Sequence, residues 1–190
     1  SLGEKIQASV FQSVTTRTAG FYTVSQEALH EESKLFCALL MFIGGSPGGT
    51  AGGVKTTTFA MLIIACITFI RGGNDTECMG RRISAANFQT GFCVVMVAFA
   101  VFITGTIAIL VIEPDSIPMV DVIYEAASAV GTVGLTADLT PYLSRSSQVI
   151  LMVMMYIGRL GPLTLVLTFA GKTHPRDKIR RLPREQIMVG

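Results

Sequence analysis

Two stretches rich in threonine and glycine, residues 16–20 and 132–135, have the composition of a cation-binding loop. A cation that sheds its water needs oxygen ligands, and backbone carbonyls supply them without net charge, so the ion binds and can still leave. Successive carbonyls point inward only where some residues adopt positive φ, which glycine tolerates. A tight turn between two helices explains either stretch equally well when it is taken alone.

The two stretches share the register of an internal repeat. An offset of 114 residues places Gly20 on Gly134 and, without a gap, residues 41–44 on 155–158. Such repeats are typical of transporters and channels, so the shared register favours an ion-selectivity filter over two unrelated turns. Because Arg17 has the same charge sign as the ion, we expect it to brace its loop from behind. The predicted filter residues are Thr16, Arg17, Thr18, Ala19, Gly20, Thr132, Val133, Gly134 and Leu135.

The segments around these loops have the composition of membrane helices. Half of the 190 residues are hydrophobic and 15% are charged, and residues 83–112 contain no Asp, Glu, Lys or Arg. A helical span needs about 20 mostly apolar residues. Because the uncharged interval 83–112 is longer than this, the sequence argues against an ordinary soluble enzyme. Short helices at 5–15 and 120–130 each run into a threonine–glycine stretch, a pattern typical of a re-entrant segment. The predicted spans are residues 35–70, 88–112 and 146–171.

The charges predict an orientation in the membrane. Residues 71–82 carry three arginines, and residues 172–190 carry six basic residues against two acidic ones. The positive-inside rule therefore puts both segments in the cytoplasm and both threonine–glycine loops outside. Acidic residues around an outer mouth would raise the local cation concentration, although they are equally well explained as solvated loop charges. These residues are Glu113, Asp115, Asp121, Glu125 and Asp138.

Six glycines between residues 44 and 53 predict a break in the first span. Glycine costs about 1 kcal/mol and proline about 3 kcal/mol in a helix interior, so span 35–70 should divide into helix, loop and helix. The backbone polar groups of such a loop must face a wet cavity, where the loop can act as a gate. The alternative is close helix packing through the four-residue spacing of Gly44, Gly48 and Gly52.

Arg159 interrupts the apolar runs 149–157 and 160–169. A charge at the centre of a membrane helix costs about 2.5–3.5 kcal/mol, so Arg159 should face a pore, where it would repel cations. Lys55, at the cytoplasmic end of the glycine-rich loop, either assists this barrier or extends its charge to the membrane surface. The predicted gate residues are Gly44, Gly45, Ser46, Gly48, Gly49, Thr50, Gly52, Gly53, Lys55 and Arg159.

A nucleotide-binding enzyme is the competing class. Residues 48–56 superficially match a phosphate-binding loop, but Val54 stands where glycine should precede Lys55, and no predicted strand leads into the segment. The two histidines, His30 and His174, lie far apart and form no metal cluster or nucleophile–base pair. We therefore expect no enzyme activity and no organic cofactor in this chain.

Four segments together resemble the Ktr/Trk/HKT superfamily of potassium transporters, and within it the bacterial KtrB subunits. They are FQSVTTRTAGF at 11–21, GGSPGGTAGGVKTTT at 44–58, GTVGLT at 131–136 and YIGRLGPLTL at 156–165. The likeness covers nearly the whole chain. It implies four span–loop–span (M–P–M) repeats around one pore with a single filter glycine in each, so that Gly20 and Gly134 would belong to the third and fourth repeats.

The expected fold class is thus an all-α integral membrane protein of M–P–M repeats, with re-entrant pore helices around a pseudo-fourfold pore. The chain holds only about two repeats, so it resembles the C-terminal half of a longer protein. Residues 1–71 would be the third repeat without its first span, with pore helix, filter and a broken second span containing intramembrane loop 44–55. Residues 72–86 would be a cytoplasmic connection, residues 87–171 the fourth repeat, and residues 172–190 a cytoplasmic tail.

The resemblance implies the ion-translocating subunit of a potassium uptake system, a multi-pass protein of the bacterial plasma membrane. K+ would bind at Thr18, Gly20, Thr132 and Gly134, with Na+ as a second candidate ion. Implied partners are membrane lipid, a second copy in a homodimer, the missing N-terminal repeats, and a cytosolic KtrA-like regulatory ring that would bind the nucleotide. No nucleic acid is implied. The alternative is a membrane scaffold whose glycines serve helix packing without transport.

Overall fold

The computed structural model describes residues 2–49, 51–72, 77–78, 81–114 and 116–161. Thr50, the end of the predicted fourth repeat at 162–171 and the predicted tail at 172–190 lie outside the described residues. A short antiparallel pairing of β1 with β2 is the one sheet of the described part, and the other elements are helices. The elements are α1 (Leu2–Thr15), α2 (Glu31–Phe42), α3 (Thr56–Ile70), β1 (Glu77–Cys78), β2 (Arg81–Arg82), α4 (Ala85–Ile112), α5 (Met119–Gly131), the 3-10 helix η1 (Thr140–Tyr142) and α6 (Arg145–Leu160).

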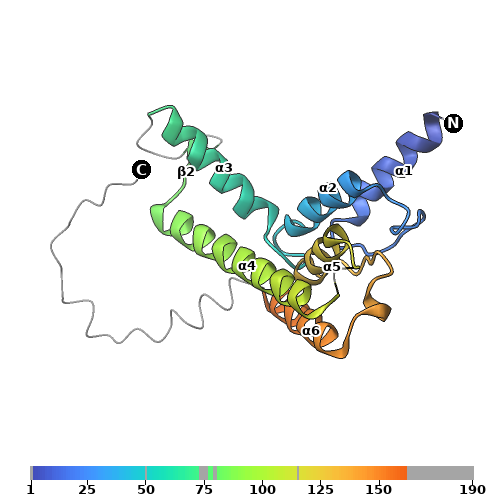
Figure 1. Cartoon of the computed structure of the whole chain (residues 1–190). Helices are drawn as coiled ribbons and strands as arrows, with labels where there is room; N and C mark the ends of the chain where they lie inside the picture. Colours follow the sequence, from blue (N-terminus) through green and yellow to red (C-terminus); the bar gives the residue numbers. More distant parts are fainter. Residues whose placement is uncertain (1, 50, 73–76, 79–80, 115, 162–190) are drawn as a thin grey trace, which may run out of the picture.

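Helix α5 lies at the centre of the fold. It packs against α2, α4 and α6, while α3 and α4 run side by side away from this centre (Figure 1). The Tyr124 side chain of α5 is fully buried, and its hydroxyl donates a hydrogen bond of 2.7 Å to Gln26 Oε1 in the segment that follows α1. The core around α5 therefore joins the N-terminal part of the chain to the C-terminal part.

Helix α4 has the length of a membrane span. Within the described part of the chain, residues 86–112 form the one helix that is long and apolar enough to cross a bilayer. Its N-cap residue, Ser84, accepts a hydrogen bond from the Asn87 amide, which satisfies one of the free donors at the helix start. Helix α3 is also apolar but has only 15 residues. The structure thus contains a helix of spanning length where the uncharged interval of the sequence predicts a span.

The chain between α2 and α3 contains the break that the glycines predict. The two ends of this loop are tied together, because the Gly44 amide donates to the Val54 carbonyl at 2.8 Å and the Val54 amide donates to Phe42 at 3.3 Å. A Cβ atom on Gly44 would overlap the carbonyl oxygen of Gly52, so this closure needs glycine. The loop doubles back on itself instead of crossing between the helices as an open strand.

Helix α2 begins four residues earlier than its predicted start at residue 35. The predicted span begins after Lys34 because a charge is costly inside an apolar span. In the structure Lys34 is buried and its Nζ lies 2.6 Å from Asp121 Oδ1 of α5. The charge is neutralised by a residue far away in the sequence, so the helix continues through it.

Candidate ion-binding site

The two threonine–glycine loops meet backbone to backbone. Gly20 has φ +75°, and a Cβ atom there would overlap the Val133 carbonyl oxygen and lie 3.9 Å from the Gly134 Cα. Glycine is therefore needed at position 20 both for its left-handed backbone and for the closeness of the second loop. Residues of two distant segments thus form one site.

Both loops use left-handed backbone at the same positions of the repeat. Thr18 and Thr132 have φ values of 67° and 52°, and Gly20 and Gly134 have values of 75° and 90°. A threonine with positive φ is uncommon and stores strain, which occurs most often at functional sites. The open space beside Gly134, where an added Cβ would meet nothing within 4 Å, leaves room for a ligand.

Three predicted filter residues direct their side chains into the protein. Thr16 is fully buried and its hydroxyl donates to the Ser13 carbonyl at 2.9 Å, whereas Val133 and Leu135 belong to the buried cluster around Tyr124. These side chains are not available to an ion. Only the backbone carbonyls of these residues remain as candidate ligands.

Arg17 lies between the first loop and the glycine-rich loop. Its Nη1 donates to the Ile43 carbonyl at 2.8 Å and to the Gly44 carbonyl at 3.3 Å. These oxygens lie at the C-terminal end of α2, where the helix dipole favours a cation. The guanidinium therefore joins the first loop to the end of α2.

The glycine-rich loop lies against the second threonine–glycine loop. A Cβ atom on Gly52 would overlap the Thr132 hydroxyl and lie 3.0 Å from the Gly131 carbonyl oxygen, and one on Gly53 would lie 3.3 Å from the Gly131 Cα. Thr132 Oγ1 is buried here and has no hydrogen-bond partner in the described part of the structure. An unsatisfied buried hydroxyl is costly, and Gly52 covers this one.

Residues predicted separately as filter and as gate share one cavity of about 460 Å³. Lys55 stabilises the loop beside it, because its Nζ donates to the Ala51 carbonyl. Gly48 has φ +85°, and an added Cβ there would meet nothing within 4 Å. The cavity is lined by Arg17, Thr18, Gly45, Ser46, Gly49, Ala51 and Thr56.

Comparison with known proteins identifies the family. Residues 1–182 match the TrkH family, described as a cation transport protein. This chain belongs to the TrkH family. It is 38% identical to the Ktr system potassium uptake protein B of Bacillus subtilis over 98% of the chain, and 33% identical to the potassium/sodium uptake protein NtpJ of Enterococcus hirae over 98%. The chain spans 41% and 42% of the length of these two relatives.

Membership of the TrkH family puts the chain among membrane transport proteins and not among enzymes. A third relative, the Ktr system potassium uptake protein B of Vibrio alginolyticus, is 33% identical over 96% of the chain and 39% of its own length. The resemblance inferred from the four sequence motifs is thereby confirmed.

The predicted pore arginine of this TrkH-family chain lies in the last turn of α6. Arg159 has an exposed side chain and follows Gly158, where an added Cβ would overlap the Val130 carbonyl oxygen near the end of α5. Gly158 therefore brings α6 against α5 just before the second loop. The same offset of 114 residues relates Gly158 to Gly44, the first glycine of the predicted gate.

Three acidic residues expected around an outer mouth have specific partners in the TrkH-family fold. Asp121 pairs with Lys34, and Glu113 accepts hydrogen bonds from the amide and hydroxyl of Ser144. Glu125 is buried and is bonded to the segment that follows the second loop. These partners were not predicted from the sequence, in which the available signal was the presence of two acidic residues, Asp121 and Glu125, in a mostly apolar helix.

Proposed function

We propose that this chain forms the filter and gate of the ion-translocating subunit of a potassium uptake system. The observation that carries the proposal is the close approach of Gly20 to Val133 and Gly134, which brings two carbonyl-bearing loops together. The potassium uptake names of the Bacillus and Vibrio relatives support K+ as the ion. The name of the Enterococcus relative supports Na+ as a second ion. Oxygen atoms of Thr18, Gly20, Thr132 and Gly134 would replace the water around the ion.

The proposed architecture is a ring of M–P–M repeats with re-entrant pore helices, of which this chain contributes about two. Helices α4, α5 and α6 would be first span, pore helix and second span of one repeat. Helix α1 would be the preceding pore helix, and α2 with α3 its broken second span. The matching φ values of the two loops support this architecture. The helix starts support it too, because α2 begins at Glu31 and α6 begins at Arg145, 114 residues later.

An apolar stripe on α1 supports a preceding repeat. The offset of 114 residues relates two residues of this stripe, Val10 and Val14, to Tyr124 and Ser128 of α5. Tyr124 and Ser128 are buried, and α5 packs on α2. By the same arrangement the α1 stripe would pack on the second span of an earlier repeat, because an exposed apolar stripe of this kind marks a contact surface. The stripe residues and their exposed fractions are Leu2 (77%), Ile6 (58%), Val10 (59%) and Val14 (62%).

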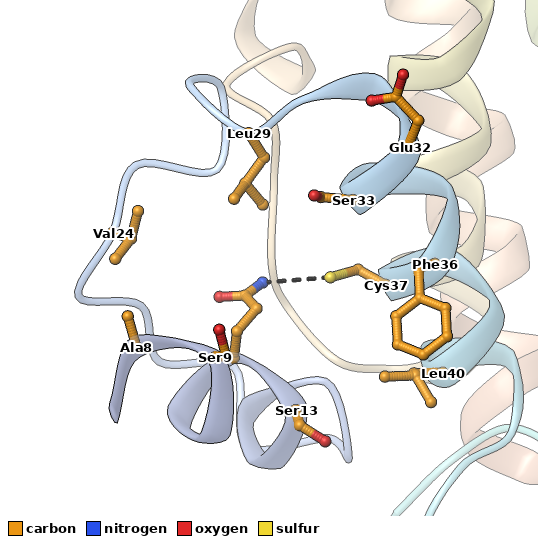
Figure 2. Close-up of a pocket in the computed structure, with 11 residues that line it drawn as sticks. Ala8, Ser9, Ser13, Val24, Leu29, Glu32, Ser33, Phe36, Cys37 and Leu40 are labelled. Atoms are coloured by element: carbon orange, nitrogen blue, oxygen red, sulfur yellow. Dashed lines mark hydrogen bonds between the residues drawn. The ribbon is translucent and has the colours of Figure 1, made fainter. Parts of the chain in front are cut away.

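A cavity of about 480 Å³ between α1 and α2 supports a missing first span (Figure 2). Four of the residues that line it are Ala8, Leu29, Cys37 and Leu40. The offset of 114 residues relates these four, in the same order, to Val122, Leu143, Leu151 and Met154 of the proposed repeat formed by α4, α5 and α6. These four belong to one buried cluster with Ile109 of α4. An apolar helix equivalent to α4 would therefore fill the cavity.

The proposed gate is the loop at 44–55 together with Arg159. Its glycines at 52 and 53 lie directly against Gly131 and Thr132, so displacement of the loop would uncover the end of the filter. Arg159 would add a fixed positive charge that raises the energy of a cation below the filter. Lys55 would hold the closed loop through its bond to Ala51.

The whole protein would be a multi-pass protein of the bacterial plasma membrane, surrounded by lipid. The words "Ktr system" in the names of the relatives support a multi-component assembly. We propose a homodimer on a cytosolic KtrA-like ring, with nucleotide bound by the ring.

The test compares K+ and Na+ uptake by the complete protein in cells that lack other potassium systems. Gly134→Ala should lower K+ uptake and the K+/Na+ ratio, because a methyl group would enter the space beside the filter. Gly72→Ala is a matched control, since Gly72 also has positive φ and open space but follows α3. Equal effects of the two substitutions on the ion ratio would contradict the proposed filter.

A scaffold role without transport is the second candidate. Close glycine packing favours it, because an added Cβ on Gly105 of α4 would overlap Met154 of α6. Absence of K+ and Na+ uptake above background by the complete, membrane-inserted protein would support the scaffold and overturn the transport proposal.

A further inference from the structure

The carboxylate of Glu125 is fastened to the chain segment that leaves the second loop. Glu125 lies on α5 with 5% of its surface exposed. Its Oε1 accepts hydrogen bonds from the Thr136 hydroxyl and, at 3.0 Å, from the Ala137 amide. Its Oε2 accepts a hydrogen bond of 3.0 Å from the Thr140 hydroxyl. Both oxygens therefore hold the segment 136–140, which follows Leu135.

The hydrogen-bond partners of Glu125 carry no charge. All three are neutral donors, namely the hydroxyls of Thr136 and Thr140 and the amide of Ala137. Within the described ranges no basic side chain forms an ion pair with Glu125, in contrast to Asp121, which pairs with Lys34. A buried, unpaired acidic residue is expensive in a membrane protein and typically marks an ion pathway.

The first loop is held in a different way. The offset of 114 residues places Phe11 at the position of Glu125 and Gln26 at the position of Thr140. The first loop is fastened by the Thr15 hydroxyl, which donates to the Phe21 carbonyl, and by the Gln26 side chain, which donates to the Val24 carbonyl at 2.7 Å. These partners are neutral. Among the described residues, a carboxylate therefore supports the second loop, and neutral groups support the first.

We propose that Glu125 is a positioning residue that determines the ion specificity of the second loop. Its hydrogen bonds fix the segment after Gly134, which sets the spacing of the carbonyl oxygens offered to the ion. This inference rests on the proposed transport function, because it names a determinant of that same site.

The experiment measures K+ and Na+ uptake against ion concentration for the complete protein in cells without other potassium systems. Glu125→Gln keeps the size and one acceptor oxygen but replaces the other acceptor oxygen with an NH2 donor, so the three hydrogen bonds cannot all form. We expect it to raise the K+ concentration for half-maximal uptake about tenfold, because the segment after Gly134 is no longer held in place. Thr136→Val keeps the carboxylate and removes one donor, so it should lower the K+/Na+ ratio by about threefold with a smaller loss of affinity.

Glu113→Gln is the matched control. Glu113 is also acidic and lies at the end of α4. Its carboxylate accepts hydrogen bonds from Ser144, at the start of α6, and not from the segment that follows the second loop. Its replacement should leave both the half-maximal K+ concentration and the ion ratio at the parent values. The amount of each variant in the membrane is measured in parallel.

Parent-like affinity and ion ratio in both Glu125→Gln and Thr136→Val would overturn the inference while the transport function stands. If Glu125→Gln does not reach the membrane, Thr136→Val decides, because it retains the buried carboxylate. A change of the same size in Glu113→Gln would also overturn it, since the effect would then be general to acidic residues. If the parent itself transports neither ion, the proposed function fails first.

Discussion

Gly20 lies so close to the Val133 carbonyl that a Cβ atom on Gly20 would overlap the carbonyl oxygen. The two residues are more than 100 positions apart, and each belongs to a loop that follows a short helix. Only glycine fits at position 20, because it has no Cβ atom and tolerates the positive φ of 75° found there. The closeness of these loops therefore depends on a single residue type at position 20.

Substitution of Gly20 by alanine is expected to destabilise the protein and abolish K+ uptake. The left-handed backbone costs about 1–3 kcal/mol for a residue other than glycine, and the overlap with Val133 adds to this. Gly134→Ala carries the same backbone cost without an overlap, so it should unfold at a higher temperature than Gly20→Ala. Thermal unfolding in detergent measures the difference. Equal stability of the two variants would contradict the loop contact.

Loss of the Arg17 brace is expected to loosen the glycine-rich loop. Arg17→Ala removes both hydrogen bonds to the carbonyls of Ile43 and Gly44, and each such charged bond contributes about 1.5–3 kcal/mol. Amide hydrogen exchange between residues 44 and 54 should become faster, and cation flux should rise severalfold. Arg17→Lys, with one flexible donor group, should give an intermediate result. Unchanged exchange would show that the brace does not hold the loop.

Removal of the Arg159 charge is expected to raise cation flux. In the proposed gate this side chain repels K+ below the filter, so Arg159→Ala should lower the barrier and increase K+ flux by about tenfold or more. Arg145→Ala provides the control, because Arg145 stands at the opposite end of the same helix. Flux measured in proteoliposomes is the test, and a parent-like rate for Arg159→Ala would count against the barrier.

Disruption of the Lys34–Asp121 pair is expected to destabilise the contact between α2 and α5. The two charges lie 2.6 Å apart and both side chains are largely buried. Removal of one partner of a buried pair costs about 3–5 kcal/mol, because the other charge is left unpaired. Lys34→Met should therefore lower the unfolding free energy by about 3 kcal/mol. The double variant Lys34→Met with Asp121→Leu should recover part of the loss, and a purely additive loss would contradict the pairing.

The start of α6 is expected to weaken in acid. Hydrogen bonds from Ser147 and Ser144 lower the pKa of Glu113 below its ordinary value of 4.5. Because the folded pKa is lower than the unfolded one, this stabilisation is fully present above pH 4.5 and is lost as the pH falls through the folded pKa. Glu113→Gln should remove this part of the pH dependence of the unfolding temperature. An unchanged acid dependence in Glu113→Gln would rule out this group as its source.

The helices and the break between α2 and α3 could be predicted from the sequence because they depend on local chemistry. An uncharged apolar interval is sufficient to predict α4, and six glycines with a proline exclude a continuous helix between Phe42 and Thr56. The positive φ expected of glycines in the two loops is present at Gly20 and Gly134, whereas the positive φ of Thr18 and Thr132 was not predicted. Membership of the cation transport family was predicted from the four motifs at 11–21, 44–58, 131–136 and 156–165 and is confirmed by the family match.

Only the tertiary structure decided which of these residues meet. The contact of Gly20 with Val133, the bonds of Glu125 to the second loop and the pairing of Lys34 with Asp121 all join segments that different helices bring together. A sequence pattern records which residues can bind a cation or turn the backbone. It does not record the packing of α5 between its neighbours, and that packing determines whether a carboxylate faces solvent, an ammonium group or a filter loop.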